Sequence, residues 1–296
     1  MTVSAFAPAK INLYLHVLGK RADGYHRLDS LVAFADIGDR VTARPAEELT
    51  LTVSGPEAAA IAGRGEDNLV MRAARRLMAR AGIGAGAALH LDKLLPAAAG
   101  IGGGSSDAAA ALRALAMLWG VPLGEPELMT LALQLGADVP ACLAGRPVWV
   151  GGIGEEIMPA GTLPQTGIVL ANPRRPLPTA AVFRRYPGPY RGSGRFDGMP
   201  PDAAGLAAIL DTRHNDLTEA ARQLVPEIGK VLDRLAGLPG ALLARMSGSG
   251  ATCFALFADR AAALASVRAL ALAEPLWWSA AGALMAAAPP VGSASL

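Results

Sequence analysis

The sequence has only two cysteines and few charges. Cys142 and Cys253 lie far apart in the apolar settings PACLAG and TCFALF, which is typical of buried thiols rather than of a disulfide. Charged residues make up 18% of the chain and hydrophobic residues 52%, a composition that excludes a disordered chain. We therefore expect a folded protein of a reducing compartment, the cytoplasm.

The sequence also lacks a long uninterrupted apolar run. Its most apolar region, near the C-terminus, is interrupted by Arg268, Glu274 and Pro275, whereas a membrane-spanning helix needs about 20 apolar residues in a row. Lys10 stands where the apolar core of a secretion signal would lie. The net charge of +2 argues against a dedicated polyanion binder. These features predict a soluble protein with neither membrane nor nucleic acid as partner.

Several catalytic signatures are absent. The sequence has no HExxH, CxxC or G-x-S-x-G pattern, so it does not support a metallohydrolase or a serine hydrolase. It has no G-x-x-x-x-G-K-[ST] loop, and a dinucleotide fingerprint that starts at Gly100 meets Ser105 where its third glycine belongs. His16, His90 and His214 show no ligand spacing. They are expected to be structural.

What the sequence does have is a glycine cluster, LPAAAGIGGGSSDAAAALRAL, over residues 95–115. An alternating strand pattern precedes it at 87–96, and Ala108, Leu112 and Leu115 follow it at helical spacing. A glycine turn that opens a helix presents backbone N–H groups and the positive end of the helix dipole to an anion. Taken alone, the cluster leaves a phosphate cradle and a tight turn equally open.

The remaining pattern predicts an α+β protein. We expect a strand over 6–20, a turn over 21–29 and several short strands over 30–55. A helix is predicted over 67–81, capped by Asp67 or Asn68, and another over 125–136. A composition shift at 159–166 places the domain boundary there. Residues 172–202 are predicted to be mainly loop, followed by helices, a strand–loop–strand element and a last helix.

Three segments together resemble the motifs of the GHMP kinase superfamily. They are APAKINLYLHVLGKRADGYHRLDSLV from residue 7, LPAAAGIGGGSSDAAAAL from residue 95 and MSGSGATCFALF from residue 246. The resemblance implies a two-domain α+β fold with the active site in the cleft between the domains. The ATP-binding domain, similar to ribosomal protein S5 domain 2, would comprise residues 1–160. An α/β-sandwich domain would comprise residues 161–296.

The stretches GADVPACLAG and NDLTEAA match those superfamily members whose substrate carries a cytidine diphosphate. The implied reaction transfers the γ-phosphate of ATP, with Mg²⁺, to the 2-hydroxyl of a cytidine-diphosphate-linked methylerythritol, a step of non-mevalonate isoprenoid synthesis. One alternative is a superfamily kinase for homoserine or mevalonate. A remote alternative is nucleic-acid binding through the basic, aromatic loop at 184–196. A monomer and a homodimer are both open.

The resemblance places the ATP phosphates on the glycine loop. The implied loop contacts are Pro96, Ala97, Ala98, Ala99, Gly100, Ile101, Gly102, Gly103, Gly104, Ser105 and Ser106. Asn68 and Lys93 match positions near the nucleotide base, although Asn68 suits a helix cap as well. Ser105 or Ser106 would contact phosphate or Mg²⁺, or cap the helix. The third motif, Ser247, Gly248, Ser249 and Gly250, would shape the cleft from the second domain.

Asp138 and Lys10 are the implied catalytic pair. Asp138 in GADVP would accept the proton of the substrate hydroxyl, whereas its position before a proline also suits a helix N-cap. Lys10 would lie beside it and neutralise charge on the transferred phosphoryl group. An ordinary solvent-facing strand lysine is the alternative. Phosphoryl transfer asks mainly for positioning and charge stabilisation, which these groups can supply.

The segment DGYH, residues 23–26, is the part of the sequence that best indicates the substrate. Tyr25 offers a flat face, and a neutral His26 can bond the edge of a cytosine. Phe183 resembles the second aromatic side chain of a cytosine sandwich, and Thr179 would line the same pocket. Asn12, close to Lys10, would contact substrate or phosphate. The alternatives are a turn histidine at 26, a core phenylalanine at 183 and a structural amide at 12.

Overall fold

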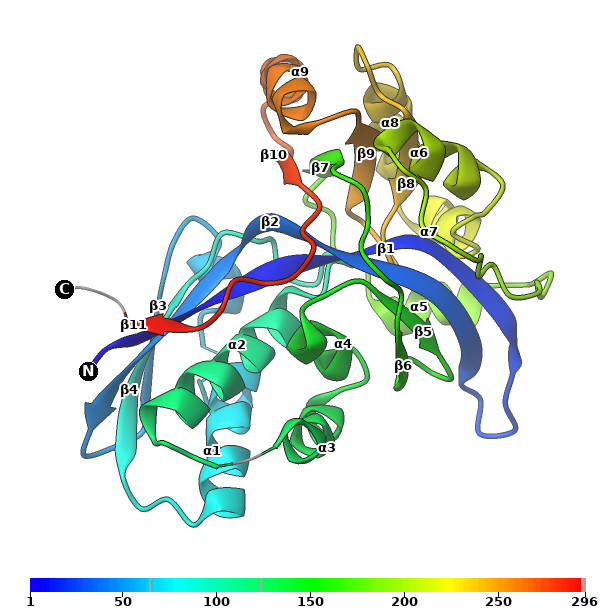
Figure 1. Cartoon of the computed structure of the whole chain (residues 1–296). Helices are drawn as coiled ribbons and strands as arrows, with labels where there is room; N and C mark the ends of the chain where they lie inside the picture. Colours follow the sequence, from blue (N-terminus) through cyan, green and yellow to red (C-terminus); the bar gives the residue numbers. More distant parts are fainter. Residues whose placement is uncertain (64, 123, 294–296) are drawn as a thin grey trace.

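The computed structural model describes residues 1–63, 65–122 and 124–293, arranged around two β-sheets (Figure 1). The first sheet is built on β1 (Val3–Lys20) and β2 (His26–Ala46), which pair antiparallel and run across the whole molecule. Its further strands are β3 (Thr50–Ser54), β4 (Gly86–Asp92), β5 (Val148–Gly151), β6 (Glu156–Pro159) and β11 (Gly292–Ser293). The mixed helices and sheets confirm the α+β class.

The prediction of several short strands over 30–55 is wrong for 30–46, which belong to a single strand of 21 residues, β2. Gly38 does not end this strand, because it sits at an irregularity where the β1–β2 register shifts between Pro8 and Ala9. A Cβ on Gly38 would lie 2.3 Å from the carbonyl oxygen of Ala7, so the glycine allows close strand contact. The predicted turn over 21–29 is likewise shorter, because β2 already begins at His26.

Helices of the N-terminal half pack against one face of the first sheet (Figure 1). They are α1 (Leu69–Ala81), α2 (Gly103–Leu118), α3 (Glu125–Leu135) and α4 (Val139–Ala144), with short 3₁₀ turns η1 (Ala58–Ile61) and η2 (Gly65–Asp67). Asn68 caps α1 by accepting a hydrogen bond from the Val70 amide, as predicted. Alanines at 108–111 are completely buried, and their small side chains let α2 lie close to β1.

The second sheet has the order β10–β7–β9–β8. Its strands are β7 (Gly167–Asn172), β8 (Leu243–Met246), β9 (Cys253–Phe257) and β10 (Trp278–Ala283). The helices of this half are α5 (Thr179–Arg185), α6 (Ala203–Asp211), α7 (Thr218–Leu224), α8 (Glu227–Ala236) and α9 (Arg260–Ala273). Of the segment predicted as mainly loop, only α5 is helical.

The chain returns to the first sheet after β10. The Met285 amide donates to the Phe34 carbonyl oxygen, and β11 pairs with β1 beside the N-terminus (Figure 1). We still propose the division at residues 160 and 161, with this C-terminal segment laid across the first half.

Both cysteines are free and buried, which confirms the thiol prediction. Burial raises the pKa of Cys142 to about 12, so this thiol is not a nucleophile at neutral pH. Among the described residues, no helix combines the length and apolarity needed to cross a bilayer.

Candidate active site

A cavity of about 900 Å³ opens where the two halves of the chain meet. Its walls come from β1, β2, the glycine loop before α2, the start of α4, α5 and the loop between β8 and β9. Most of the residues predicted for the site line this single cavity. They are Lys10, Asn12, Tyr25, His26, Ala98, Ala99, Gly100, Gly102, Gly103, Gly104, Ser105, Asp138, Thr179, Phe183, Gly248 and Ser249.

The glycine loop turns directly into α2. Gly102 occupies the N-cap position with φ 62°, and the helical ladder opens with the Ser106 amide donating to the Gly102 carbonyl oxygen. The amides of Gly103, Gly104 and Ser105 precede that bond, so helix geometry leaves them without intrahelical acceptors. These three amides line the cavity at the positive end of a 16-residue helix. This arrangement is suited to phosphate.

Glycine is required here because two backbones meet. A Cβ on Gly100, whose φ is 74°, would lie 2.5 Å from the Gly250 carbonyl oxygen, and one on Gly248 would lie 2.7 Å from the Gly100 carbonyl oxygen. Ser247 strengthens the contact, because its hydroxyl donates to the Gly100 carbonyl oxygen at 3.1 Å. The second and third motifs, the glycine loop and the 247–250 loop, are therefore packed main chain against main chain.

We expect Gly100→Ala to weaken ATP binding and to lower stability by about 1–3 kcal/mol, since the added methyl group has no room. Gly120→Ala is the matched control, because Gly120 has a similar φ of 62° but no heavy atom within 4 Å of the added Cβ. The control should lose about 1 kcal/mol from backbone strain alone and keep its ATP affinity. Urea unfolding and nucleotide titration measure the two effects. Equal losses in both variants would contradict the close-packing explanation.

Lys10 and Asp138 meet across 128 residues of sequence. The Lys10 Nζ donates to Asp138 Oδ1 at 2.7 Å. The Lys10 side chain is only 6% exposed, whereas the Asp138 side chain is 49% exposed toward the cavity that both line. Asp138 does occupy the N-cap position of α4, but its side chain makes no capping hydrogen bond. The carboxylate is thus held by Lys10 and open to a ligand.

Asn12 lines the cavity and contacts both the third motif and β2. Its backbone amide donates to Ser247 Oγ at 3.1 Å, and its side-chain Nδ2 donates to Ser30 Oγ at 2.8 Å. Its Oδ1 is buried and has no hydrogen-bond partner among the described residues. A buried acceptor of this kind is costly unless a ligand supplies the missing donor.

The structure does not bring every predicted nucleotide contact to the cavity. The Ser106 hydroxyl is fully buried and donates to the Pro8 carbonyl oxygen at 2.7 Å, so it is unavailable to phosphate or Mg²⁺. Ile101 is also fully buried. The Asn68 side chain caps α1. Pro96, Ala97, Ser247 and Gly250 support the loops without lining the cavity.

Lys93 requires the largest correction. Its side chain is 2% exposed and forms ion pairs with two buried carboxylates, those of Asp39 and Asp107. A Cβ on Gly103 would lie 3.2 Å from the Lys93 Nζ, so the ammonium group lies directly beneath the start of α2. The Lys93 side chain therefore does not reach the cavity, which the prediction required, but supports the glycine loop from below.

The opposite end of the cavity is aromatic. The His26 and Phe183 rings stack at 5.4 Å between centroids with 26° between planes, and the Tyr186 ring meets His26 edge-on at 6.1 Å. Burial and, secondarily, the Lys20 charge lower the pKa of His26, so its imidazole is neutral at neutral pH. Tyr25 is 61% exposed at the rim. Thr179, at the start of α5, has its hydroxyl 2.9 Å from that of Ser249.

Two cations also line this cavity: Lys20, which sequence reasoning missed, and Arg184, which it considered only as part of the basic loop. Lys20 ends β1 just before the DGYH turn, and Arg184 directly follows Phe183. Their proximity to Tyr25, His26 and Phe183 in sequence was an available signal. They add positive charge to the aromatic end of the site.

Part of the basic loop at 184–196 makes contacts within the protein. Arg191 pairs with Asp216 and Arg195 with Asp29, two carboxylates that are almost completely buried. Phe196 packs edge-on against Trp149 and lies under the Arg213 guanidinium group. These groups are held by contacts within the protein, whereas Arg184, Arg185 and Tyr190 of the same loop are exposed.

The family models for GHMP kinases match both halves of the chain. The N-terminal domain model matches residues 68–146, and the C-terminal model matches residues 201–273. The chain is 52% identical over 279 residues to the 4-diphosphocytidyl-2-C-methyl-D-erythritol kinase of Paramagnetospirillum magneticum, covering 94% of this chain and 97% of that protein. It is 54% identical over 283 residues to the kinase of the same name from Cereibacter sphaeroides, covering 93% and 96%.

Solved structures agree with this relationship. A crystal structure of 4-(cytidine 5'-diphospho)-2C-methyl-D-erythritol kinase matches with a TM-score of 0.76 and 35% identity, covering 95% of this chain and 98% of that one. The homoserine kinase of Cytophaga hutchinsonii matches with a TM-score of 0.72 but 18% identity, covering 98% and 96%, and so shares the fold alone. The chain belongs to the GHMP kinases, within the family of the 4-diphosphocytidyl-2-C-methyl-D-erythritol kinases.

Proposed function

We propose that the protein transfers the γ-phosphate of ATP to the 2-hydroxyl of 4-(cytidine 5'-diphospho)-2-C-methyl-D-erythritol, giving the 2-phosphate and ADP. The observation that carries this proposal is one cavity with three chemically different parts. The cavity is lined by a helix start suited to phosphates, by the Lys10–Asp138 pair and by the His26–Phe183 stack. The product would serve the synthesis of isoprenoid precursors by the non-mevalonate route.

In the proposed mechanism, the amides of Gly103, Gly104 and Ser105 hold the phosphate tail of ATP. Asp138 accepts the proton of the substrate hydroxyl as its oxygen attacks the γ-phosphorus. Lys10, 2.7 Å from that carboxylate, holds it in place and neutralises charge on the phosphoryl oxygens. Asn12 Oδ1, the unpaired acceptor beside them, would receive a hydrogen bond from the bound substrate.

The donor set fits Mg²⁺ bound mainly by the nucleotide. Among the described residues, no group of three His, Cys, Asp or Glu side chains is placed to hold a metal ion. Mg²⁺ keeps several waters and commonly takes one or two protein oxygens together with substrate phosphates. Ser105, which lines the cavity at the start of α2, is the proposed protein ligand. When bound, Mg²⁺ would neutralise the phosphate charge.

The aromatic end suits a pyrimidine base. A neutral imidazole can both donate and accept at the Watson–Crick edge of cytosine, and stacked rings favour a flat ligand. Lys20 and Arg184 bring positive charge to the same end, which suits a substrate that carries a diphosphate. Homoserine and mevalonate have neither a base nor a diphosphate and would leave these groups unused.

We expect His26→Ala to weaken competition by cytidine nucleotides about tenfold, because a lost hydrogen bond to a ligand is worth about 1–2 kcal/mol. The affinity for ATP should stay within about twofold, since His26 lies at the other end of the cavity. His90→Ala is the control, because the His90 ring bonds to the hydroxyls of Thr52 and Ser54 on the first sheet and does not line the cavity formed by the described residues. Inhibition kinetics with cytidine diphosphate provide the measurement.

The proposal as a whole is tested by following γ-phosphate transfer to a panel of alcohols. The panel contains the cytidine-linked methylerythritol, homoserine and mevalonate. Transfer to homoserine or mevalonate, with no competition by cytidine nucleotides, would overturn the assignment of substrate while leaving the kinase fold intact.

A further inference from the structure

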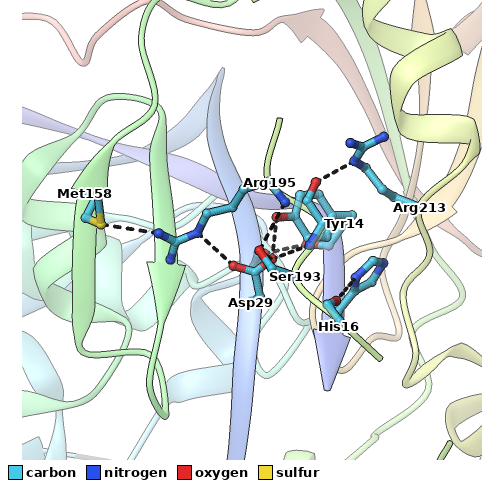
Figure 2. A network of polar contacts seen from close by, with 10 residues as sticks. Tyr14, His16, Asp29, Met158, Ser193, Arg195 and Arg213 are labelled. Carbon is cyan, nitrogen blue, oxygen red and sulfur yellow. Dashed lines mark hydrogen bonds and ion pairs between the residues drawn. The ribbon is translucent and has the colours of Figure 1, made fainter. Parts of the chain in front are cut away.

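Residues 191–195, here called the strap, lie across the outer part of the β1–β2 hairpin. The Arg191 amide donates to the Val17 carbonyl oxygen at 2.9 Å, and His16 Nδ1 lies 3.1 Å from the Gly192 carbonyl oxygen. A Cβ on Gly194 would lie 2.8 Å from the Tyr14 ring. The strap therefore touches β1 along its length. Figure 2 shows it from close by.

One buried carboxylate holds the C-terminal part of the strap. Asp29 on β2 is 2% exposed and accepts four hydrogen bonds (Figure 2). The donors are Tyr14 Oη at 2.8 Å, the Gly194 amide at 2.7 Å, Arg195 Nε at 2.9 Å and Ser193 Oγ at 3.1 Å. A carboxylate this deeply buried is stable only with such partners.

A second carboxylate holds the N-terminal part. One carboxylate oxygen of Asp216 accepts a hydrogen bond from Arg191 Nε at 2.5 Å. The other accepts one from the Val17 amide at 2.9 Å. The Asp216 side chain is 2% exposed, whereas that of Arg191 is 40% exposed. Asp216 thus joins the strap, β1 and the start of the helical region that contains α7.

The strap is continuous with the aromatic end of the cavity. Arg191 directly follows Tyr190, whose ring packs 6.4 Å from that of Tyr186. Tyr186 in turn meets His26, which also stacks on Phe183. On the other side, Asp29 lies three residues after His26 on β2. The strap is therefore connected to the aromatic contact in two ways. It follows Tyr190 along the chain, and it is hydrogen-bonded to Asp29, which lies on the same strand as His26.

No helix or strand holds the segment between α5 and α6, which runs from 186 to 202. Ordering a segment of this kind costs backbone entropy of about 1–2 kcal/mol per residue. The carboxylate contacts at the strap are the charged interactions that oppose this cost. If they are lost, the aromatic rings of 183–190 are expected to move away from His26.

We propose that Asp29 and Asp216 are positioning residues, which act through the strap to hold Phe183 and Tyr186 against His26 and so set the affinity for a pyrimidine nucleoside diphosphate. The identity of this ligand rests on the proposed function. The positioning itself is a property of the protein alone and can be measured without a ligand.

The test uses Asp216→Asn, Arg191→Ala and Arg195→Ala, with cytidine 5'-diphosphate as the probe. Asp216→Asn keeps an oxygen for the Val17 amide but replaces the oxygen that accepts from Arg191 by an NH2 group, which removes the ion pair. We expect binding of the probe to weaken about 2- to 30-fold in each variant, the range found for residues that act on a site without touching its ligand. The KM for ATP should stay within about twofold, and Arg191→Lys should recover part of the loss.

A second readout requires no ligand. When Phe183 and Tyr186 loosen, His26 becomes more hydrated, so its pKa should rise toward the ordinary value of 6.5 in a proton NMR titration. Arg234→Ala is the matched control. Arg234 Nε pairs with Glu274 Oε1 at a distance of 2.9 Å, and neither residue lines the cavity formed by the described residues. That variant should change neither readout.

The outcomes are distinguishable. If the variants bind the probe as the wild type does and the His26 titration is unchanged, the positioning role is wrong. If the wild type itself fails to bind cytidine 5'-diphosphate, the proposed substrate is wrong, while a shifted His26 titration in the variants still supports the strap. If Arg191→Ala does not fold, Arg191→Lys and Asp216→Asn decide the question.

Discussion

Asp138→Asn is expected to lower the rate of phosphoryl transfer by about 10²–10⁴-fold, the usual contribution of a positioned proton acceptor. Asparagine keeps the shape of the side chain but cannot take the proton of the substrate hydroxyl. It also removes the ion pair with Lys10, whose Nζ lies 2.7 Å from the carboxylate. The glycine loop is a separate wall of the cavity, so ATP should still bind.

The measurement is a single-turnover assay of γ-phosphate transfer, combined with nucleotide titration of the same variant. Asp233→Asn is the control, because Asp233 is exposed on α8 and does not line the cavity. A variant at 138 that keeps near-normal turnover would remove Asp138 from the proton-accepting role. Loss of ATP binding together with turnover would point to a damaged cavity instead.

Lys93→Met is expected to lower the free energy of unfolding by about 3–5 kcal/mol, the cost of breaking a buried ion pair from one side. Lys93 is 2% exposed and pairs with Asp39 and Asp107, which are 0% and 3% exposed. Asp39 also accepts hydrogen bonds from the backbone amides of Leu94 and Leu95. These two residues begin the segment that leads into the glycine loop. Without the ammonium group, two buried carboxyl groups lose the cation that they share.

The loss should depend on pH. Burial raises the pKa of Asp107 to about 8, and the Lys93 charge opposes that rise. In Lys93→Met the folded-state pKa is therefore higher still. A carboxyl group whose pKa is raised by folding costs no stability below its unfolded value, near 3.8, and costs more as the pH rises above it. Because Asp107 is neutral in both folded proteins below about pH 8, this part of the deficit should appear only as the pH is raised above about 8.

Urea unfolding at several pH values measures this effect. Lys230→Met, an exposed lysine on α8, is the control and should change stability by less than about 0.5 kcal/mol. Adding Asp107→Asn to Lys93→Met should restore part of the loss, since it removes one of the two buried carboxyl groups. A loss in Lys93→Met as small as in the control would mean that the three groups are not coupled as the structure has them.

The sequence by itself determined the local features. These features follow from short-range rules, because the interacting groups are a few residues apart. They are the cap of α1 at Asn68, the end of α3 at Gly136 and the turn of the glycine loop into α2. The family motifs indicated which of these local features belong to one site. Buried thiols were likewise predictable from their apolar neighbours.

Only the tertiary structure decided which way individual side chains face. Lys10 and Lys93 are both strand-associated lysines among apolar neighbours, yet Lys10 faces the cavity and Lys93 is enclosed by two carboxylates. Ser105 and Ser106 are adjacent, but the rotation of about 100° between consecutive helix residues puts the first in the cavity and the second beneath Pro8. The strap depends on Asp29 and Asp216 in the same way. Each of these outcomes depends on groups far apart in the chain, and a buried charge or hydroxyl goes where packing supplies its partner.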